Sequence, residues 1–185
     1  MSTSQTQRNR ASVRSLVRGL YGLADAGGGA GDPVRLADAL LIGGCRLIQL
    51  RCKDWKVDEI ERAGREVAAR CHQVGATFIL NDHAALVRAV GADGVHVGQL
   101  DIDSDAARRL IGPDAILGRS THSEEQLAQA CRNADYVAFG PIWSTKNTDR
   151  DKGERGLAAL ARARDIVGEL PLVAIGSIDA LRVPL

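Results

Sequence analysis

Short runs of leucine and β-branched residues alternate with longer amphipathic segments along most of this chain, and this alternation restricts the possible folds more than any other feature. The short runs cover residues 20–24, 47–50, 77–80, 94–97, 116–117, 136–139 and 172–175. Strands that alternate with helices in this way form a parallel sheet covered by those helices. The sequence therefore predicts an α/β domain, built either as an eight-stranded closed barrel or as an open doubly wound sheet.

Three of the intervening segments carry specific helix signals. Asp32 is suited to cap a helix whose first residue is Pro33, because a proline at that position loses no hydrogen bond. Ser123 followed by Gln126 matches a capping box at the start of a later helix. Between these two segments, apolar residues recur at steps of three and four and form one stripe: Ile60, Ala63, Val67, Cys71 and Val74.

The size, charge and cysteine content of the chain limit the classes of protein to which it can belong. A chain of 185 residues with 45% hydrophobic content can bury one core, so we expect a single domain over residues 19–185. A formal net charge of +1 argues against a nucleic-acid partner, and no apolar run is long enough to span a membrane. The cysteines form no CxxC pair, which argues against a zinc or redox centre: Cys45, Cys52, Cys71 and Cys131.

The N-terminal residues 1–18 contain serine, threonine, glutamine and arginine but no acidic residue. Organelle transit peptides share this composition. We prefer the simpler interpretation, a frayed tail that leads into a short helix over the floor of the barrel. Together with the unpaired cysteines, it predicts a cytoplasmic protein.

Polar residues follow nearly every predicted strand. They lie in segments 49–54, 81–83, 96–101, 118–122, 140–146 and 176–177. In parallel α/β sheets the ligand binds beyond the carboxyl ends of the strands, so polar residues there have more functional weight than those at strand starts. Because the polar groups come from so many strands, the closed barrel is favoured over the open sheet.

The second predicted strand ends with a possible anion site. Side chains alternate along a strand, so Gln49, Arg51 and Lys53 point to one side while Leu50 and Cys52 point to the other. On a barrel strand this places an amide and two cations in the mouth. The alternative is that both cations are ordinary surface residues and that the amide is hydrogen-bonded inside.

Asp82 and Asp101 follow two neighbouring predicted strands. Two carboxylates beside an anionic ligand would repel it unless a divalent cation lay between, and Mg²⁺ binds through one or two carboxylates together with substrate phosphates. The pair therefore predicts a magnesium site. Alternatively, Asp82 caps the next helix and Asp101 is a solvated turn residue.

A serine and a histidine, Ser120 and His122, follow the fifth predicted strand. No acidic residue is placed to orient the histidine and no nucleophile elbow is present, so a ligand hydrogen bond from Ser120 is favoured over nucleophilic catalysis. His96 lies at the end of an apolar strand and is expected to be a hydrogen-bonded interior residue. His83 is expected at a helix start.

Taken in order, these segments are similar to the thiamine-phosphate synthase (thiamine-phosphate pyrophosphorylase) family over residues 20–178. The similarity is carried by segments 49–54, 80–83, 91–101, 118–123, 135–142 and 173–176. The resemblance implies a (β/α)8 fold of the TIM-barrel type. It also implies a transferase of thiamine biosynthesis that joins hydroxymethylpyrimidine diphosphate to a thiazole phosphate and releases pyrophosphate.

The resemblance also implies roles for individual residues. Asp82 and Asp101 would hold Mg²⁺ on the diphosphate. Arg51, Lys53 and Ser120 would be the catalytic residues, and no side-chain nucleophile would be needed. The substrate-binding residues would be those at the strand ends: Gln49, Arg51, Lys53 and Asn81 on the diphosphate, Ser120 on the pyrimidine, and Thr145, Lys146 and Gly176 on the thiazole phosphate.

The chain departs from the family pattern in its C-terminal part. The usual Thr-x-Thr-Lys is Thr-Lys-Asn-Thr at residues 145–148, so Lys146 or Lys152 would have to reach the phosphate instead. The usual Gly-Gly-Ile is Gly176-Ser177-Ile178. The family's eighth strand and final helix have no counterpart, so we expect a barrel without its last β/α unit. Either a neighbouring chain in a homo-oligomer covers the exposed edges, or the protein is a weakly active copy.

Two other functions remain open from the sequence. The thiazole tautomerases are near relatives with the same barrel, but they tend to lose the paired aspartates that this chain retains as Asp82 and Asp101. The second alternative is a non-catalytic remnant that binds a diphosphate. Mg²⁺-dependent diphosphate binding without product formation would favour the remnant.

Overall fold

The fold is a parallel sheet whose strands pair in the order of the chain. The structure, a computed structural model, describes residues 13–27, 31–145 and 153–183. Seven strands form one sheet in the order β1 to β7, and every neighbouring pair is parallel. The strands are β1 (Tyr21–Asp25), β2 (Leu47–Arg51), β3 (Thr77–Asn81), β4 (Gly94–Val97), β5 (Ile116–Thr121), β6 (Tyr136–Phe139) and β7 (Leu172–Ala174). Each predicted run overlaps one of them.

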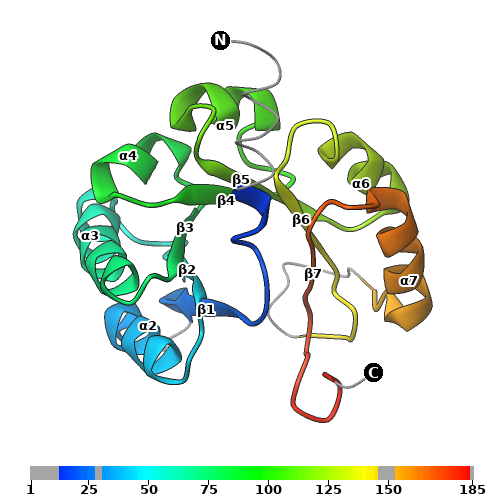
Figure 1. Ribbon diagram of the computed structural model, residues 1–185, viewed down its shortest axis with the longest axis horizontal. Helices are drawn as coiled ribbons and strands as arrows, with labels where there is room; N and C mark the ends of the chain where they lie inside the picture. Colours follow the sequence, from blue (N-terminus) through cyan, green and yellow to red (C-terminus); the bar gives the residue numbers. More distant parts are fainter. Residues whose placement is uncertain (1–12, 28–30, 146–152, 184–185) are drawn as a thin grey trace.

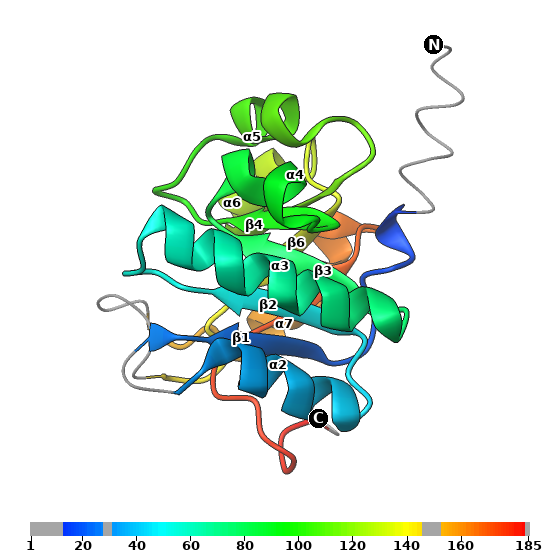
Figure 2. The same ribbon diagram turned by 90° about the vertical axis from the view of Figure 1, so that its left-hand side faces the viewer.

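The helices lie around the outside of the curled sheet (Figure 1). They are α2 (Pro33–Ile42), α3 (Val57–Gln73), α4 (Val87–Val90) with the preceding 3-10 turn η2 (Ala84–Leu86), α5 (Ser104–Ile111), α6 (Glu124–Ala130) and α7 (Gly156–Val167). Figure 2 shows α2 and α3 along the outer face of the first strands. The predicted parallel α/β architecture is confirmed. β1 and β7 are the edges of the sheet, and within the described residues they do not pair with each other.

The predicted helix signals act largely as expected. The Asp32 carboxylate accepts a hydrogen bond from Val34 N at 2.9 Å, with Pro33 in the first turn. Ser123 caps α6, but the Gln126 side chain accepts from His122 N, one residue before the cap. The apolar stripe of α3 is buried from Ile60 to Cys71. Its last predicted member, Val74, lies beyond α3 and is 46% exposed.

The alternation of side chains along the strands divides the core in two. On β2, Ile48 and Leu50 pack against the helices outside the sheet. Leu47 points inward, where it joins an inner cluster that also contains Val13 and Val17 of the N-terminal segment. That segment crosses the curled sheet before β1 begins (Figure 1). The inside of the sheet is therefore filled near the strand starts, which leaves the strand ends for polar groups.

Two aspartates that lie just before a strand have the same structural role. Asp93 precedes β4 and accepts a hydrogen bond from Phe78 N of β3 at 2.7 Å. Asp135 precedes β6 and accepts one from Leu117 N of β5 at 2.9 Å. Both aspartates, each preceded by alanine, thus bind the start of the strand alongside. Among the described residues, no helix combines the length and apolar character that crossing a bilayer requires.

Gly94 is expected to be essential for stability because it leaves no room for a side chain. A Cβ atom there would lie 2.2 Å from Ile116 O and 2.6 Å from Ile116 Cβ. We expect Gly94→Ala to lower the free energy of unfolding by about 1–3 kcal/mol, measured by urea denaturation. The matched control is Gly153→Ala, where no atom lies within 4 Å of the new Cβ. Equal denaturation midpoints for the two variants would contradict the packing argument.

Candidate active site

An ion pair links the ends of the first two strands. Asp25 and Arg51 are register partners on β1 and β2, and the Arg51 Nη1 atom lies 2.8 Å from Asp25 Oδ2. Asp25 also accepts from Gly27 N at 2.8 Å. Both charged side chains are partly exposed, at 29% for Arg51 and 31% for Asp25. The guanidinium is therefore held at the strand ends with a part of its surface open to a ligand.

The two predicted metal ligands meet beyond β3 and β4. The side chains of Asp82 and Asp101 share a hydrogen bond. Asp82 adopts a positive φ of 64° and donates from its backbone N to His96 O at 2.8 Å, which brings its carboxyl group towards β4. Asp101 is exposed and accepts from Gly98 N at 2.7 Å. The alternative in which Asp82 caps a helix is wrong, because His83 occupies the cap position of η2.

The surroundings of Asp82 only partly compensate the negative charge of its carboxylate. Burial, the hydrogen bond to Asp101 and the charge of Asp101 raise the pKa of Asp82 from 3.8 to about 7, although the charges of Arg51 and Lys53 oppose the shift. A divalent cation between the two carboxylates would remove this repulsion. Within the described residues, no group of three or more His, Cys, Asp or Glu side chains gathers as a ligand set. The donor set fits a hard cation that takes its other ligands from water and phosphate.

The raised pKa predicts a pH dependence of stability. Because the pKa of folded Asp82 is about 7 and its ordinary value is 3.8, the folded protein retains a proton that the unfolded chain has lost. In EDTA, the contribution of Asp82 to the free energy of unfolding therefore falls as the pH rises through this interval. Asp82→Asn should flatten that slope in urea denaturation series, and Asp165→Asn on α7 should leave it unchanged. Identical slopes for both variants would contradict the prediction.

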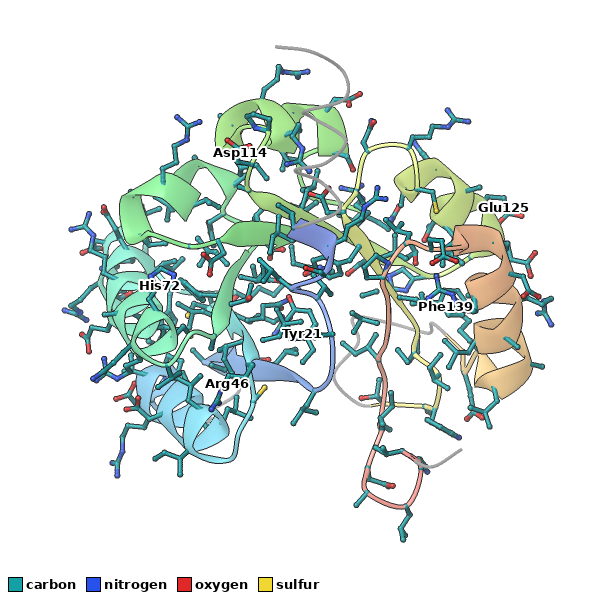
Figure 3. The ribbon with its side chains drawn as sticks, viewed as in Figure 1. Tyr21, Arg46, His72, Asp114, Glu125 and Phe139 are labelled. Atoms are coloured by element: carbon teal, nitrogen blue, oxygen red, sulfur yellow. The ribbon has the colours of Figure 1, made fainter. Side chains whose placement is uncertain are left out.

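The inside of the sheet holds a chain of hydrogen bonds between side chains. Gln49 Nε2 donates to Tyr21 Oη at 2.9 Å, and the hydroxyl groups of Tyr21 and Tyr136 lie 2.7 Å apart. Tyr136 Oη lies 2.9 Å from His96 Nδ1, and His96 Nε2 lies 2.8 Å from Ser120 Oγ. Figure 3 shows Tyr21 inside the curled sheet. The prediction that His96 is a hydrogen-bonded interior residue is confirmed.

This chain of contacts does not form a nucleophilic dyad. Burial, followed by the charge of Arg119, lowers the pKa of His96 to about 4, so its ring is a weak base towards Ser120. His122 contacts Gly140 O through Nδ1 at 2.7 Å. Burial and the charge of Asp25 raise the pKa of the nearby Cys52 thiol to about 12. The site is therefore built for binding and for charge stabilisation.

The other predicted substrate residues lie at the same ends of the strands. Gln49 is only 4% exposed and Asn81 is 9% exposed, whereas Lys53 is exposed. Thr145 is half-buried in the loop after β6. Lys146 and its possible substitute Lys152 lie outside the described residues.

Gly176 lies in the turn after β7 and is hydrogen-bonded to the loop after β6. Gly176 O accepts from Trp143 N at 3.3 Å, and Ser177 Oγ donates to Ser144 O at 2.7 Å. Gly176 has a φ of 112°, and a Cβ atom there would lie 2.6 Å from the Cα atom of Pro141. The contacts place Gly176 close to the segment that contains Thr145. The side chain of Ser177 turns towards Ser144.

Comparison with known proteins identifies the family. The family model described as thiamine monophosphate synthase matches residues 20–185. The chain belongs to the thiamine monophosphate synthase family. A thiamine-phosphate synthase of Mycobacterium avium (strain 104) is 41% identical over 177 residues, which cover 89% of this chain and 78% of the relative. One from Laribacter hongkongensis is 39% identical over 151 residues, or 82% of this chain and 71% of the relative.

A solved structure shares the fold of this thiamine monophosphate synthase family member. Thiamine phosphate pyrophosphorylase from Pyrococcus furiosus aligns with a TM-score of 0.79 and 29% sequence identity, covering 90% of this chain and 78% of that one. The family identity predicted from the ordered strand-end segments is thus confirmed.

Sequence reasoning missed three residues of the site in this family member. Asp25 lies one residue beyond the predicted end of the first strand, so it was not recognised as a strand-end group. Tyr21 and Tyr136 are the two tyrosines of the chain, and both lie on inward-facing strand positions. A tyrosine within a strand of a parallel sheet is a usable signal, because its hydroxyl group needs a partner once buried.

Proposed function

We propose that this chain joins hydroxymethylpyrimidine diphosphate to a thiazole phosphate and forms thiamine phosphate and pyrophosphate. The observation that carries the proposal is the close approach of Asp82 and Asp101, with the charges of Arg51 and Lys53 acting on the same carboxyl group. Paired carboxylates beside cations suit a metal-bound diphosphate. Membership of the thiamine monophosphate synthase family supports the same reaction.

The residues at the ends of β2 and β3 would bind the diphosphate. Asp82 and Asp101 would hold Mg²⁺, which supplies charge neutralisation to the departing diphosphate when it is bound. Arg51 and Lys53 would bind the diphosphate oxygens, and Asn81 would contribute its amide. Gln49 is turned towards Tyr21 through Nε2, which leaves its Oε1 atom for a ligand.

The reaction needs no covalent intermediate on the protein. The bond between the pyrimidine methylene carbon and the diphosphate oxygen breaks, and the electron pair leaves with the diphosphate. The lone pair of the thiazole nitrogen then forms the new carbon–nitrogen bond. Arg51 and Lys53 would stabilise the separating charge, and the strand ends would hold the two substrates in line.

The second substrate would bind at the other side of the mouth. Ser120 would contact the pyrimidine, while Thr145 and the backbone N–H of Gly176 would contact the thiazole phosphate. The hydrogen bond from Trp143 N to Gly176 O supports this assignment, since it brings the turn after β7 close to the loop after β6 that contains Thr145. Lys146 remains a candidate for the same phosphate.

We also infer that residues 19–185 form one domain, in which the curled sheet supplies seven of the eight strands of a (β/α)8 barrel. The curvature of the sheet and the ring of helices support the barrel. We propose a cytoplasmic location, in keeping with four free cysteines. A homo-oligomer would cover the edges of β1 and β7.

The reaction itself is tested by incubating the purified chain with both substrates and MgCl₂. We expect equal amounts of thiamine phosphate and pyrophosphate, measured by chromatography and a coupled phosphate assay, and no product in EDTA. Binding of the pyrimidine diphosphate in calorimetry without any product would refute the proposed activity. So would isomerisation of the thiazole phosphate as the sole reaction.

A further inference from the structure

The hydrogen-bond chain inside the sheet crosses five strands. It runs from Gln49 on β2 through Tyr21 on β1, Tyr136 on β6 and His96 on β4 to Ser120 on β5. All four contacts are 2.9 Å or shorter. His96 is 6% exposed, so its ring cannot exchange these partners for water.

The aromatic rings of these hydrogen-bonded residues are closely packed inside the sheet. A Cβ atom on Gly118 of β5 would lie 2.1 Å from Cζ of the Tyr136 ring, so that ring needs a glycine at this position. The rings of His96 and Tyr136 stack with centroids 5.4 Å apart, and Tyr21 meets Tyr136 edge to face at 5.9 Å. Packing therefore restrains the aromatic rings independently of their hydrogen bonds.

The amide of Gln49 lies at one end of this hydrogen-bond chain, and as a donor it sets the direction of the hydrogen bonds that follow. Each tyrosine hydroxyl has one proton, and a neutral imidazole has one N–H. Because Gln49 Nε2 donates to Tyr21, the proton of Tyr21 is available for Tyr136 Oη. In this direction Tyr136 would donate to His96 Nδ1, and the Nε2–H group of His96 would donate to Ser120 Oγ.

The opposite direction is less favourable with this amide orientation. Tyr21 Oη would accept from both Gln49 and Tyr136, and the described hydrogen bonds offer no other acceptor for its proton. A buried donor without an acceptor costs about 1–3 kcal/mol. The His96 ring has hydroxyl partners at both nitrogens, and within the described residues no carboxylate bonds to it. A charged imidazolium is therefore disfavoured as well.

We propose that Gln49, Tyr21, Tyr136 and His96 are positioning residues that orient the Ser120 hydroxyl as a hydrogen-bond donor towards the ligand. Since Ser120 Oγ already accepts from His96, its own proton points to the mouth of the sheet. The group that it selects is an acceptor with a free lone pair, such as an unprotonated ring nitrogen. This inference rests on the proposed function for the identity of that ring, a pyrimidine.

The tautomer of His96 tests the direction without any measurement of activity. We would label the histidines with ¹⁵N and assign His96 by its loss in His96→Gln. Protonated Nε2 and bare Nδ1 are expected, whereas a protonated Nδ1 would overturn the proposal. The result is readable in a protein that makes no thiamine phosphate, so failure of the proposed function is distinguishable from failure of this inference.

Two variants that each remove one hydroxyl group separate the two directions. Tyr136→Phe removes the donor to Nδ1, so the ¹⁵N spectrum should show that His96 loses its single tautomer. Tyr21→Phe leaves Tyr136 free to donate to Nδ1, so the tautomer should persist. A change of tautomer in Tyr21→Phe alone would support the opposite direction and overturn the proposal. Urea denaturation of both variants checks that they fold.

The assay of thiamine phosphate formation tests the effect of the hydrogen-bond chain on substrate binding. In Tyr136→Phe, the KM for the pyrimidine diphosphate should rise about tenfold, as expected for one misdirected hydrogen bond. A pyridine analogue that has C–H in place of the selected ring nitrogen should bind wild type and Tyr136→Phe equally. A full tenfold preference for wild type with that analogue would refute the assignment of Ser120 as a donor to the ring.

Discussion

Replacing Asp101 by alanine is expected to lower the rate of thiamine phosphate formation by about 10³-fold while the protein remains folded. The loss of one of two metal ligands removes several kcal/mol of stabilisation from the departing diphosphate. The fold should tolerate the change because Asp101 is exposed and its hydrogen bonds to the backbone are local ones with Gly98. Initial rates at saturating MgCl₂, together with urea denaturation, measure the two effects.

The control for this variant is Asp165→Ala, which removes an exposed carboxylate of α7 far along the chain from the strand-end pair. It should retain the wild-type rate. Asp101→Asn should be nearly as slow as Asp101→Ala, since a neutral amide is a weak ligand for Mg²⁺. A rate for Asp101→Ala within about threefold of wild type would show that Asp101 is not a metal ligand.

The strand-end residues could be predicted because their positions follow from local pattern. A run such as Thr77–Asn81 is apolar and short, and whatever follows it must lie at the carboxyl edge of a parallel sheet. That reasoning places Asp82 and Asp101 near each other without any knowledge of side-chain contacts. The side of the strand on which Gln49 points follows in the same way from the period of two.

The contacts across the inside of the sheet could not be predicted. Tyr21 and Tyr136 are 115 residues apart, and their hydroxyl groups meet only because the sheet curls. The curl depends on packing between all the helices and strands, and no short segment encodes it. The ion pair of Arg51 with Asp25 was missed for a simpler reason. The first strand extends one residue further than its apolar pattern.

Replacing Arg51 by alanine is expected to lower kcat for thiamine phosphate formation by about 10²–10³-fold. The guanidinium is held by Asp25 at 2.8 Å, so it is oriented before the ligand arrives. Removing a preorganised cation from a site of charge separation costs this much in comparable enzymes. The variant also leaves Asp25 without its cation, so that the remaining carboxylate repels the diphosphate.

Three further variants separate charge, geometry and fold. Arg70→Ala is the matched control, because Arg70 pairs with Asp38 at the same distance of 2.8 Å on the helical layer. It should retain the wild-type rate. Arg51→Lys keeps the charge but not the planar fork, so it should recover only part of the loss. Asp25→Asn should reduce the rate less than Arg51→Ala, since the cation remains although its orientation is weaker. Equal activity of Arg51→Ala and Arg70→Ala would contradict the assignment of Arg51 to the diphosphate.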